Sequence, residues 1–124
     1  MIEEIKVTDG RANITLTGAI KAEDFLSVIE QIKSHQDFPL IRYQLWRTDA
    51  DATFSINGKD LNRILVYARA QPTPNPALKI AVVAGSSLAF GLGRMYEAFT
   101  GEAPWKLSIF STDESAETWF QIQE

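Results

Sequence analysis

Residues 78–99 constrain the fold of this chain more than any other stretch, because a wholly apolar strand there passes directly into a helix. Residues 80–84 have no polar side chain on either face, so a strand formed by them must be covered on all sides. Gly85 breaks the run, and Ser86 and Ser87 follow with side chains that are suited to cap a helix. We therefore expect a central strand followed at once by a helix.

That helix carries an apolar stripe. At roughly 100° per residue, four large apolar side chains fall within about 60° of arc; they are Leu88, Leu92, Met95 and Phe99. We expect this stripe to face the sheet. Gly91 and Gly93 together lower the helix propensity by about 2 kcal/mol, so at least one of them should serve close packing or binding.

Length and composition describe one ordinary domain. A chain of 124 residues can bury about two-thirds of its unfolded surface around a single core. Its hydrophobic fraction of 45% and charged fraction of 23% are normal for a soluble globular protein. Cysteine is absent, which excludes disulfides, thiolate catalysis and cysteine-ligated zinc. We expect a single domain over residues 1–124, with no metal or cofactor.

Charge and hydropathy exclude two classes of partner. The net charge is −4 and the basic residues are scattered, which argues against nucleic-acid binding. No apolar run approaches the roughly 18 residues of a membrane span. The acidic start MIEEIKV lacks the apolar core of a signal peptide, so the cytoplasm is the expected location.

The first half of the chain predicts a hairpin, a helix and a strand. Alternating residues on either side of Asp9 and Gly10 indicate an antiparallel hairpin. Helical spacing begins near Lys21 and ends before Pro39. Residues 40–46 favour a strand with one polar face that we expect to be wet, formed by Arg42, Gln44 and Trp46.

The second half predicts three helices, a connector and two strands. Asn57 and Asp60 indicate the cap of a second helix. The segment QPTPNPALK has proline at every second position and is an extended connector. After the central strand and the third helix, residues 107–110 alternate as a strand, and Ser111 with Glu114 predicts the capping box of a last helix.

The resulting order of elements is ββαβαβαβα. Most strands have one polar face and each helix has a single apolar stripe, so two layers are the economical arrangement. We expect an α/β fold with a mixed sheet of about five strands and helices mainly on one face.

One acidic loop suggests catalysis. Asp49 and Asp51 form a D-x-D-x-T pattern after a strand, as in haloacid-dehalogenase-type phosphatases that bind magnesium. Arg47 and Thr48 separate the strand from the first aspartate, however, and a solvated acidic loop explains the pattern better. A phosphatase is therefore the third hypothesis. The only histidine, His35, is interpreted as a polar residue at a helix end rather than a metal ligand.

The turn after the central strand is a candidate ligand site. The backbone N–H groups of Gly85, Ser86, Ser87 and Leu88 lie at a helix start that has no acidic residue in its first turn. Such a helix end can bind a small anionic or lipid ligand. The simpler interpretation is that Ser86 or Ser87 caps the helix.

The outer face of the same helix is a candidate partner surface. Phe90, Arg94 and Glu97 should place an exposed aromatic ring beside an ion pair. Aromatic residues and arginine are the residues that interfaces favour, so a protein partner would be sought here first.

Several of these segments together resemble the STAS domain family (sulfate transporter and anti-sigma-factor antagonist), in its SpoIIAA-like branch, also described as STAS/SEC14-like. The resemblance covers about residues 80–120 and is carried by the central strand, G-L-G-R-M-Y-E-A-F at 91–99, the strand 107–110, and Ala116 with Trp119 and Phe120. It implies a mixed sheet backed by helices and a non-catalytic role in binding protein partners or small ligands.

The resemblance also bears on regulation. In members that are switched by phosphorylation, the second helix opens with Asp-Ser-Ser-Gly or a near variant, and the first serine accepts the phosphate. Here the corresponding residues are Ser55-Ile56-Asn57-Gly58, which places Ile56 at the acceptor position. Ser55, one residue earlier, is kept as the candidate phosphorylation site because added charge there would lie near a helix start.

The first hypothesis is thus a cytoplasmic, non-enzymatic STAS-like module that regulates through a protein partner. The alternative is a binder or sensor of a small anionic or lipid ligand at 85–88. The identity of the partner and the formation of a homodimer are left open.

Overall fold

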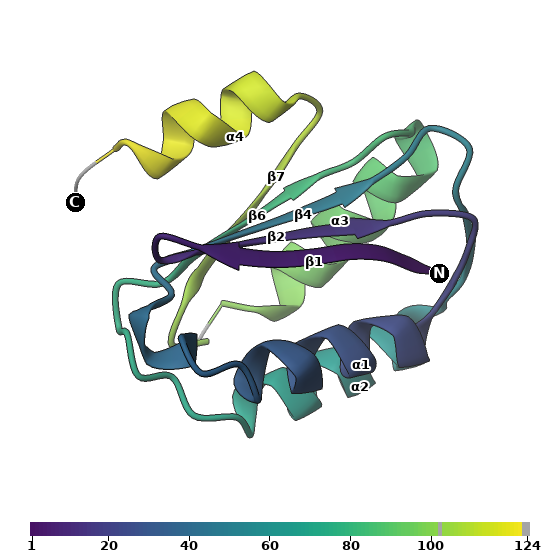
Figure 1. Ribbon diagram of the computed structural model, residues 1–124. Helices are drawn as coiled ribbons and strands as arrows, with labels where there is room; N and C mark the ends of the chain where they lie inside the picture. Colours follow the sequence, from purple (N-terminus) through teal and green to yellow (C-terminus); the bar gives the residue numbers. More distant parts are fainter. Residues whose placement is uncertain (102, 123–124) are drawn as a thin grey trace.

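The fold is known from a computed structural model that describes residues 1–101 and 103–122 (Figure 1). One five-stranded mixed sheet has the order β1-β2-β4-β6-β7, and β3 and β5 form a separate two-stranded ribbon. The strands are β1 (Ile2–Thr8), β2 (Arg11–Leu16), β3 (Ala19–Lys21), β4 (Tyr43–Thr48), β5 (Thr53–Ser55), β6 (Lys79–Val83) and β7 (Lys106–Phe110). The helices are α1 (Ala22–Lys33), η1 (Phe38–Leu40), α2 (Gly58–Arg69), α3 (Ser87–Phe99) and α4 (Asp113–Phe120).

The predicted fold class is confirmed. β1 and β2 form the antiparallel hairpin, whose turn residues Asp9 and Gly10 have φ angles of 51° and 78°. Strands β2, β4, β6 and β7 are parallel. Helices α1, α2 and α3 lie on one face of the sheet and α4 lies on the other (Figure 1). The ribbon of β3 and β5 is an addition that the sequence pattern did not predict.

The face under α4 is closely packed. Buried residues of β4 and β6 meet two buried residues of α4, in a cluster of Leu45, Ala81, Val83, Ala116 and Phe120. The rings of Tyr43 and Phe120 lie 4.8 Å apart between centroids. This short helix therefore seals the part of the sheet that it covers.

Charged side chains tie α4 to the strands at several points. Arg11 of β2 donates two hydrogen bonds of 2.6 Å to the carboxylate of Glu117. Arg47 of β4 donates to Asp113 at 2.7 Å. The buried Lys79 donates to the carbonyl oxygens of Trp119 and Ile122 at the end of α4. A positive charge at this end of a helix interacts favourably with the helix dipole.

The helix caps match the predictions in one case and differ in another. Asn57 caps α2 as expected, since its side chain accepts from the backbone N–H of Asp60 at 2.9 Å. The predicted capping box of Ser111 with Glu114 is wrong by one residue. Thr112 is the cap of α4 and accepts from the backbone N–H of Ser115 at 3.2 Å, because either hydroxyl can serve and the helix starts one residue later.

The predicted orientation of α3 is also wrong. The stripe expected to face the sheet is largely exposed, with 59% of Leu88, 45% of Met95 and 42% of Phe99 accessible to solvent. The face turned inward is that of Ala89, Gly93 and Tyr96, and of the predicted stripe only Leu92 lies on it. A Cβ on Gly93 would lie 3.1 Å from the Ile109 side chain, so close packing of the helix on β7 selects the small residues.

Two glycines illustrate how tightly the chain approaches itself near this helix. A Cβ on Gly85 would lie 2.3 Å from the carbonyl oxygen of Thr48, so the turn requires glycine. The expected packing role of Gly91 or Gly93 is confirmed for Gly93, whereas Gly91 faces open space.

Candidate functional site: a cavity between the sheet and three helices

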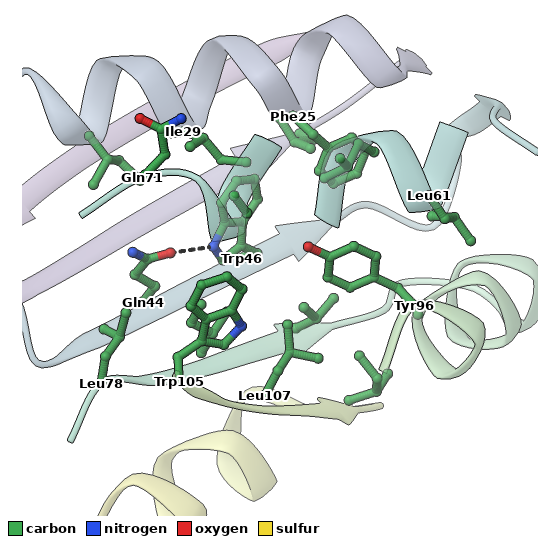
Figure 2. Close-up of a pocket in the computed structure, with 18 of the residues that line it drawn as sticks. Phe25, Ile29, Gln44, Trp46, Leu61, Gln71, Leu78, Tyr96, Trp105 and Leu107 are labelled. Atoms are coloured by element: carbon green, nitrogen blue, oxygen red, sulfur yellow. Dashed lines mark hydrogen bonds between the residues drawn. The ribbon is translucent and has the colours of Figure 1, made fainter. Parts of the chain in front are cut away.

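A cavity of about 160 Å³ lies between one face of the sheet and helices α1, α2 and α3 (Figure 2). Its walls are mainly aliphatic and aromatic, and it is partly open to solvent. The central wall residues are Phe25, Ile29, Trp46, Leu61, Ile64, Ile80, Val82, Leu92, Tyr96, Trp105, Leu107 and Ile109.

The cavity exists because α2 packs against the neighbouring helices, α1 and α3, more than against the sheet. Two polar contacts join α1 and α2, from Arg63 to Glu23 at 2.8 Å and from the Tyr67 hydroxyl to Glu30 at 2.5 Å. As a result the side chains of Ile80 and Val82 are only half-buried, although β6 is an inner strand.

The polar face of β4 forms part of the cavity wall, and the expectation that this face is wet is wrong for two of its residues. Gln44 and Trp46 are 9% and 8% exposed, because the helices cover them. The indole Nε1 of Trp46 donates to Oε1 of Gln44 at 3.0 Å. Only Arg42, outside the strand, is exposed.

Trp105 and Tyr96 are two of the further polar side chains that line the cavity. Trp105 is 8% exposed, and its Nε1 has no hydrogen-bond partner among the described residues. Tyr96 projects from α3, and Figure 2 shows its hydroxyl directed toward Trp46 and Trp105. Burial raises the pKa of Tyr96 well above its ordinary value, so the phenol remains neutral at physiological pH.

The charged residues along the cavity wall are already paired. Lys33 lies 3.0 Å from a carboxylate oxygen of Glu30, and Arg47 contacts Asp113 on the opposite face of the sheet. The cavity therefore presents apolar surface with a few neutral hydrogen-bonding groups.

The turn predicted as a ligand site lies outside this cavity. Gly85, Ser86, Ser87 and Phe90 line a separate shallow hollow together with Ser111. The Ser86 hydroxyl accepts from the backbone N–H of Ala89 at 3.1 Å, so Ser86 is the helix cap. Leu88 points to solvent.

Two of the three residues of the predicted partner surface are arranged as expected, and the third is not. Arg94 and Glu97 form the expected ion pair, at 3.3 Å. Phe90 is half-buried beside the turn rather than exposed. The large apolar residues that are exposed on α3 are Leu88, Met95 and Phe99.

The remaining candidates lie apart from the cavity. Ser55 is exposed at the end of β5, while the neighbouring Ile56 lines the cavity. Asp49 and Asp51 are exposed in a loop. His35 follows α1, and its Nδ1 accepts from the backbone N–H of Asp37 at 3.0 Å. No group of three potential metal-ligating side chains occurs among the described residues.

The cavity does not follow from the sequence pattern, because apolar side chains on α1 and α2 predict a core in the same way whether or not space is left inside it. Two signals in the sequence point to it. Gln44 and Trp46 alternate on a strand that the structure places inside the sheet, and Trp105 precedes a strand that the sequence predicts to be half-buried.

Comparisons with known proteins do not extend these observations: no family model, curated protein or solved structure matches the chain. Within the part of the chain that the structure describes, no helix is both long enough and apolar enough to span a bilayer.

Proposed function

We propose that this protein binds a small, largely apolar molecule in the cavity between the sheet and helices α1 to α3, and that it acts as a non-enzymatic carrier or sensor. The cavity itself is the observation that carries the proposal: it is about 160 Å³ in volume and is lined by aliphatic and aromatic residues. An apolar cavity of about 150 Å³ is large enough to bind benzene. Convergent neutral polar groups in such a site serve to orient a ligand.

The proposal keeps the ligand-binding alternative but moves its location. The turn at 85–88 is used for helix capping and for a hydrogen bond from the Gly85 N–H to the Thr48 hydroxyl. The cavity offers much more apolar surface to a ligand than this turn does.

The three tryptophans of the chain allow a direct test. Trp46 and Trp105 line the cavity, whereas Trp119 packs on the opposite face of the sheet. Titration with toluene, followed by proton–nitrogen NMR of the indole N–H groups, should shift the signals of Trp46 and Trp105 and leave that of Trp119 unchanged. Equal shifts at all three, or no saturable shift, would contradict the proposal.

A cavity-filling variant makes the same test with a matched control. Ala68 lines the cavity from α2, so Ala68→Phe should weaken toluene binding by more than about tenfold. Ala98 is exposed on α3, and Ala98→Phe should leave binding unchanged. Retained binding in Ala68→Phe would place the toluene site elsewhere.

A second candidate function is binding of a protein partner through the outward face of α3. The observation that favours it is the exposed apolar stripe of Leu88, Met95 and Phe99, with Arg94 beside it. Contiguous exposed apolar residues are typical of interaction sites. A regulatory module would use this surface without chemistry of its own.

The partner surface is tested by Arg94→Glu. This substitution should abolish capture of a partner from the source cells while changing the free energy of unfolding by less than about 0.5 kcal/mol, as for an ordinary surface site. Sedimentation of the purified protein shows whether the partner is a second copy. Undiminished capture by the variant would remove this surface from consideration.

A further inference from the structure

Several side chains of the cavity wall can donate hydrogen bonds. An indole nitrogen can only donate, and that of Trp105 is buried without a partner among the described residues. The Tyr96 hydroxyl also has a proton to donate, and no hydrogen bond to it is found among the same residues. Figure 2 shows the Trp105 nitrogen on the edge of the ring nearer to Tyr96. A buried donor without an acceptor is costly, so the Trp105 N–H is suited to an acceptor on a ligand, to which the Tyr96 hydroxyl can donate as well.

Gln44 supplies a further hydrogen-bond donor. Because the Trp46 indole can only donate, the side-chain atom of Gln44 that it contacts at 3.0 Å must be the amide oxygen. The acceptor of this amide is thus engaged, and its NH₂ group is left as another donor on the cavity wall.

The acceptor that fits these donors is uncharged. A carboxylate would also accept hydrogen bonds, but no unpaired cation among the described residues lines the cavity to compensate its charge. Lys33 is bound to Glu30 and Arg47 to Asp113. Moving an ionised carboxylate from water into this apolar space would therefore be unfavourable.

We propose that the ligand is a neutral molecule with an apolar body and a carbonyl or ether oxygen, and that this oxygen accepts hydrogen bonds from Trp105 Nε1 and the Tyr96 hydroxyl. This inference rests on the function proposed above and adds the chemical class of the ligand.

Three probes of similar size separate the alternatives on the full-length protein. Acetophenone has an apolar body with a carbonyl, cumene has nearly the same shape without the oxygen, and benzoate has a charged acceptor. Dissociation constants from the NMR titration are measured for wild type and for Trp105→Phe, which keeps an aromatic ring but removes the donor. Acetophenone should lose affinity roughly fivefold in the variant, the loss expected for one hydrogen bond. Cumene should lose none.

Tyr96→Phe is the second variant and is used in the same way, so the test stands even if Trp105→Phe does not fold. Trp119→Phe, on the opposite face, is the control that should change neither affinity. In wild type, acetophenone should also move the Trp105 indole proton downfield, which cumene should not do.

The outcomes distinguish the two proposals. If none of the three probes binds, the proposed function fails. If cumene and acetophenone bind but neither donor variant selectively weakens acetophenone, the cavity binds ligands and the assignment of the acceptor is wrong. If benzoate binds as tightly as acetophenone, the ligand need not be neutral and the inference is overturned.

Discussion

The two faces of this sheet are built from the same strands and differ in how they are covered. Under α4, residues of β4 and β6 form a closely packed cluster, and ion pairs and a buried lysine fasten the helix. Under α1, α2 and α3, the strands face a cavity of about 160 Å³. A single helix of 8 residues thus covers its part of the sheet more completely than three longer helices cover theirs.

Close packing is thus found on one face of the sheet and open space on the other. Close packing gains dispersion and hydrophobic energy from every added contact, and a cavity forgoes part of that gain. In this protein the face under α4 supplies well-packed contacts, so the other face can leave space for a ligand. Three experiments test this difference between the two faces.

The largest effect is expected from truncating an aromatic residue on each face. Phe120 is buried against Tyr43 and lies beside the Arg11 guanidinium. Phe120→Ala should lower the free energy of unfolding by about 3–5 kcal/mol, measured by urea denaturation. Phe25 is half-buried and stacks on Trp46 beside the cavity, so Phe25→Ala should cost clearly less. Equal losses would mean that the cavity face is packed as tightly as the other.

Two neighbouring valines of β6 allow the same substitution to be compared on the two faces of the sheet. Val83 belongs to the cluster under α4, while Val82 lines the cavity. Val83→Ala should cost about 2 kcal/mol, and Val82→Ala should cost under about 1 kcal/mol, because its side chain is already only partly surrounded. The same urea experiment measures both. The comparison fails if Val82→Ala proves the more damaging change.

The smallest effect concerns the ion pair between Arg11 and Glu117. Hydrogen bonds from Arg11 hold the pKa of Glu117 below its ordinary value of 4.5. A carboxylate with a lowered pKa stabilises the fold above its ordinary pKa, and this contribution is lost as the pH falls through the lowered value. Both side chains are partly exposed, so the contribution should be under about 1 kcal/mol.

The test compares unfolding of wild type and Glu117→Gln between pH 6 and pH 3, roughly the range over which glutamates titrate. The advantage of wild type at the upper end should shrink on acidification. A constant difference across the range would show that the pair contributes no pH-dependent stability.

Much of the fold could be predicted from local chemistry. The Asp9-Gly10 turn requires positive φ angles that these two residues tolerate, and the cap from Asn57 to Asp60 is contained within four residues. Such features depend only on neighbours in the chain. They predict where the main elements begin and end, and the mixed sheet is predicted from the polar and apolar faces of those elements.

The orientation of α3 and the cavity could not be predicted in the same way. The large residues of α3 indicate one face, but the close approach of Gly93 to Ile109 selects another. The wet face expected for β4 depended on whether α1 and α2 cover Gln44, which is a property of the assembled layers. Periodicity reports polarity around an element, whereas a cavity is set by the distance between elements.

The order of the strands has a consequence for how the molecule assembles. In the main sheet each strand pairs with the one that precedes it in that sheet along the chain, so strands can be added one after another, each parallel strand through a crossover that contains a helix. Every residue that lines the cavity precedes α4 in the chain. Arg11 and Glu117, in contrast, are 106 residues apart. Helix α4 is therefore expected to dock last, onto a sheet whose other face already holds the walls of the cavity.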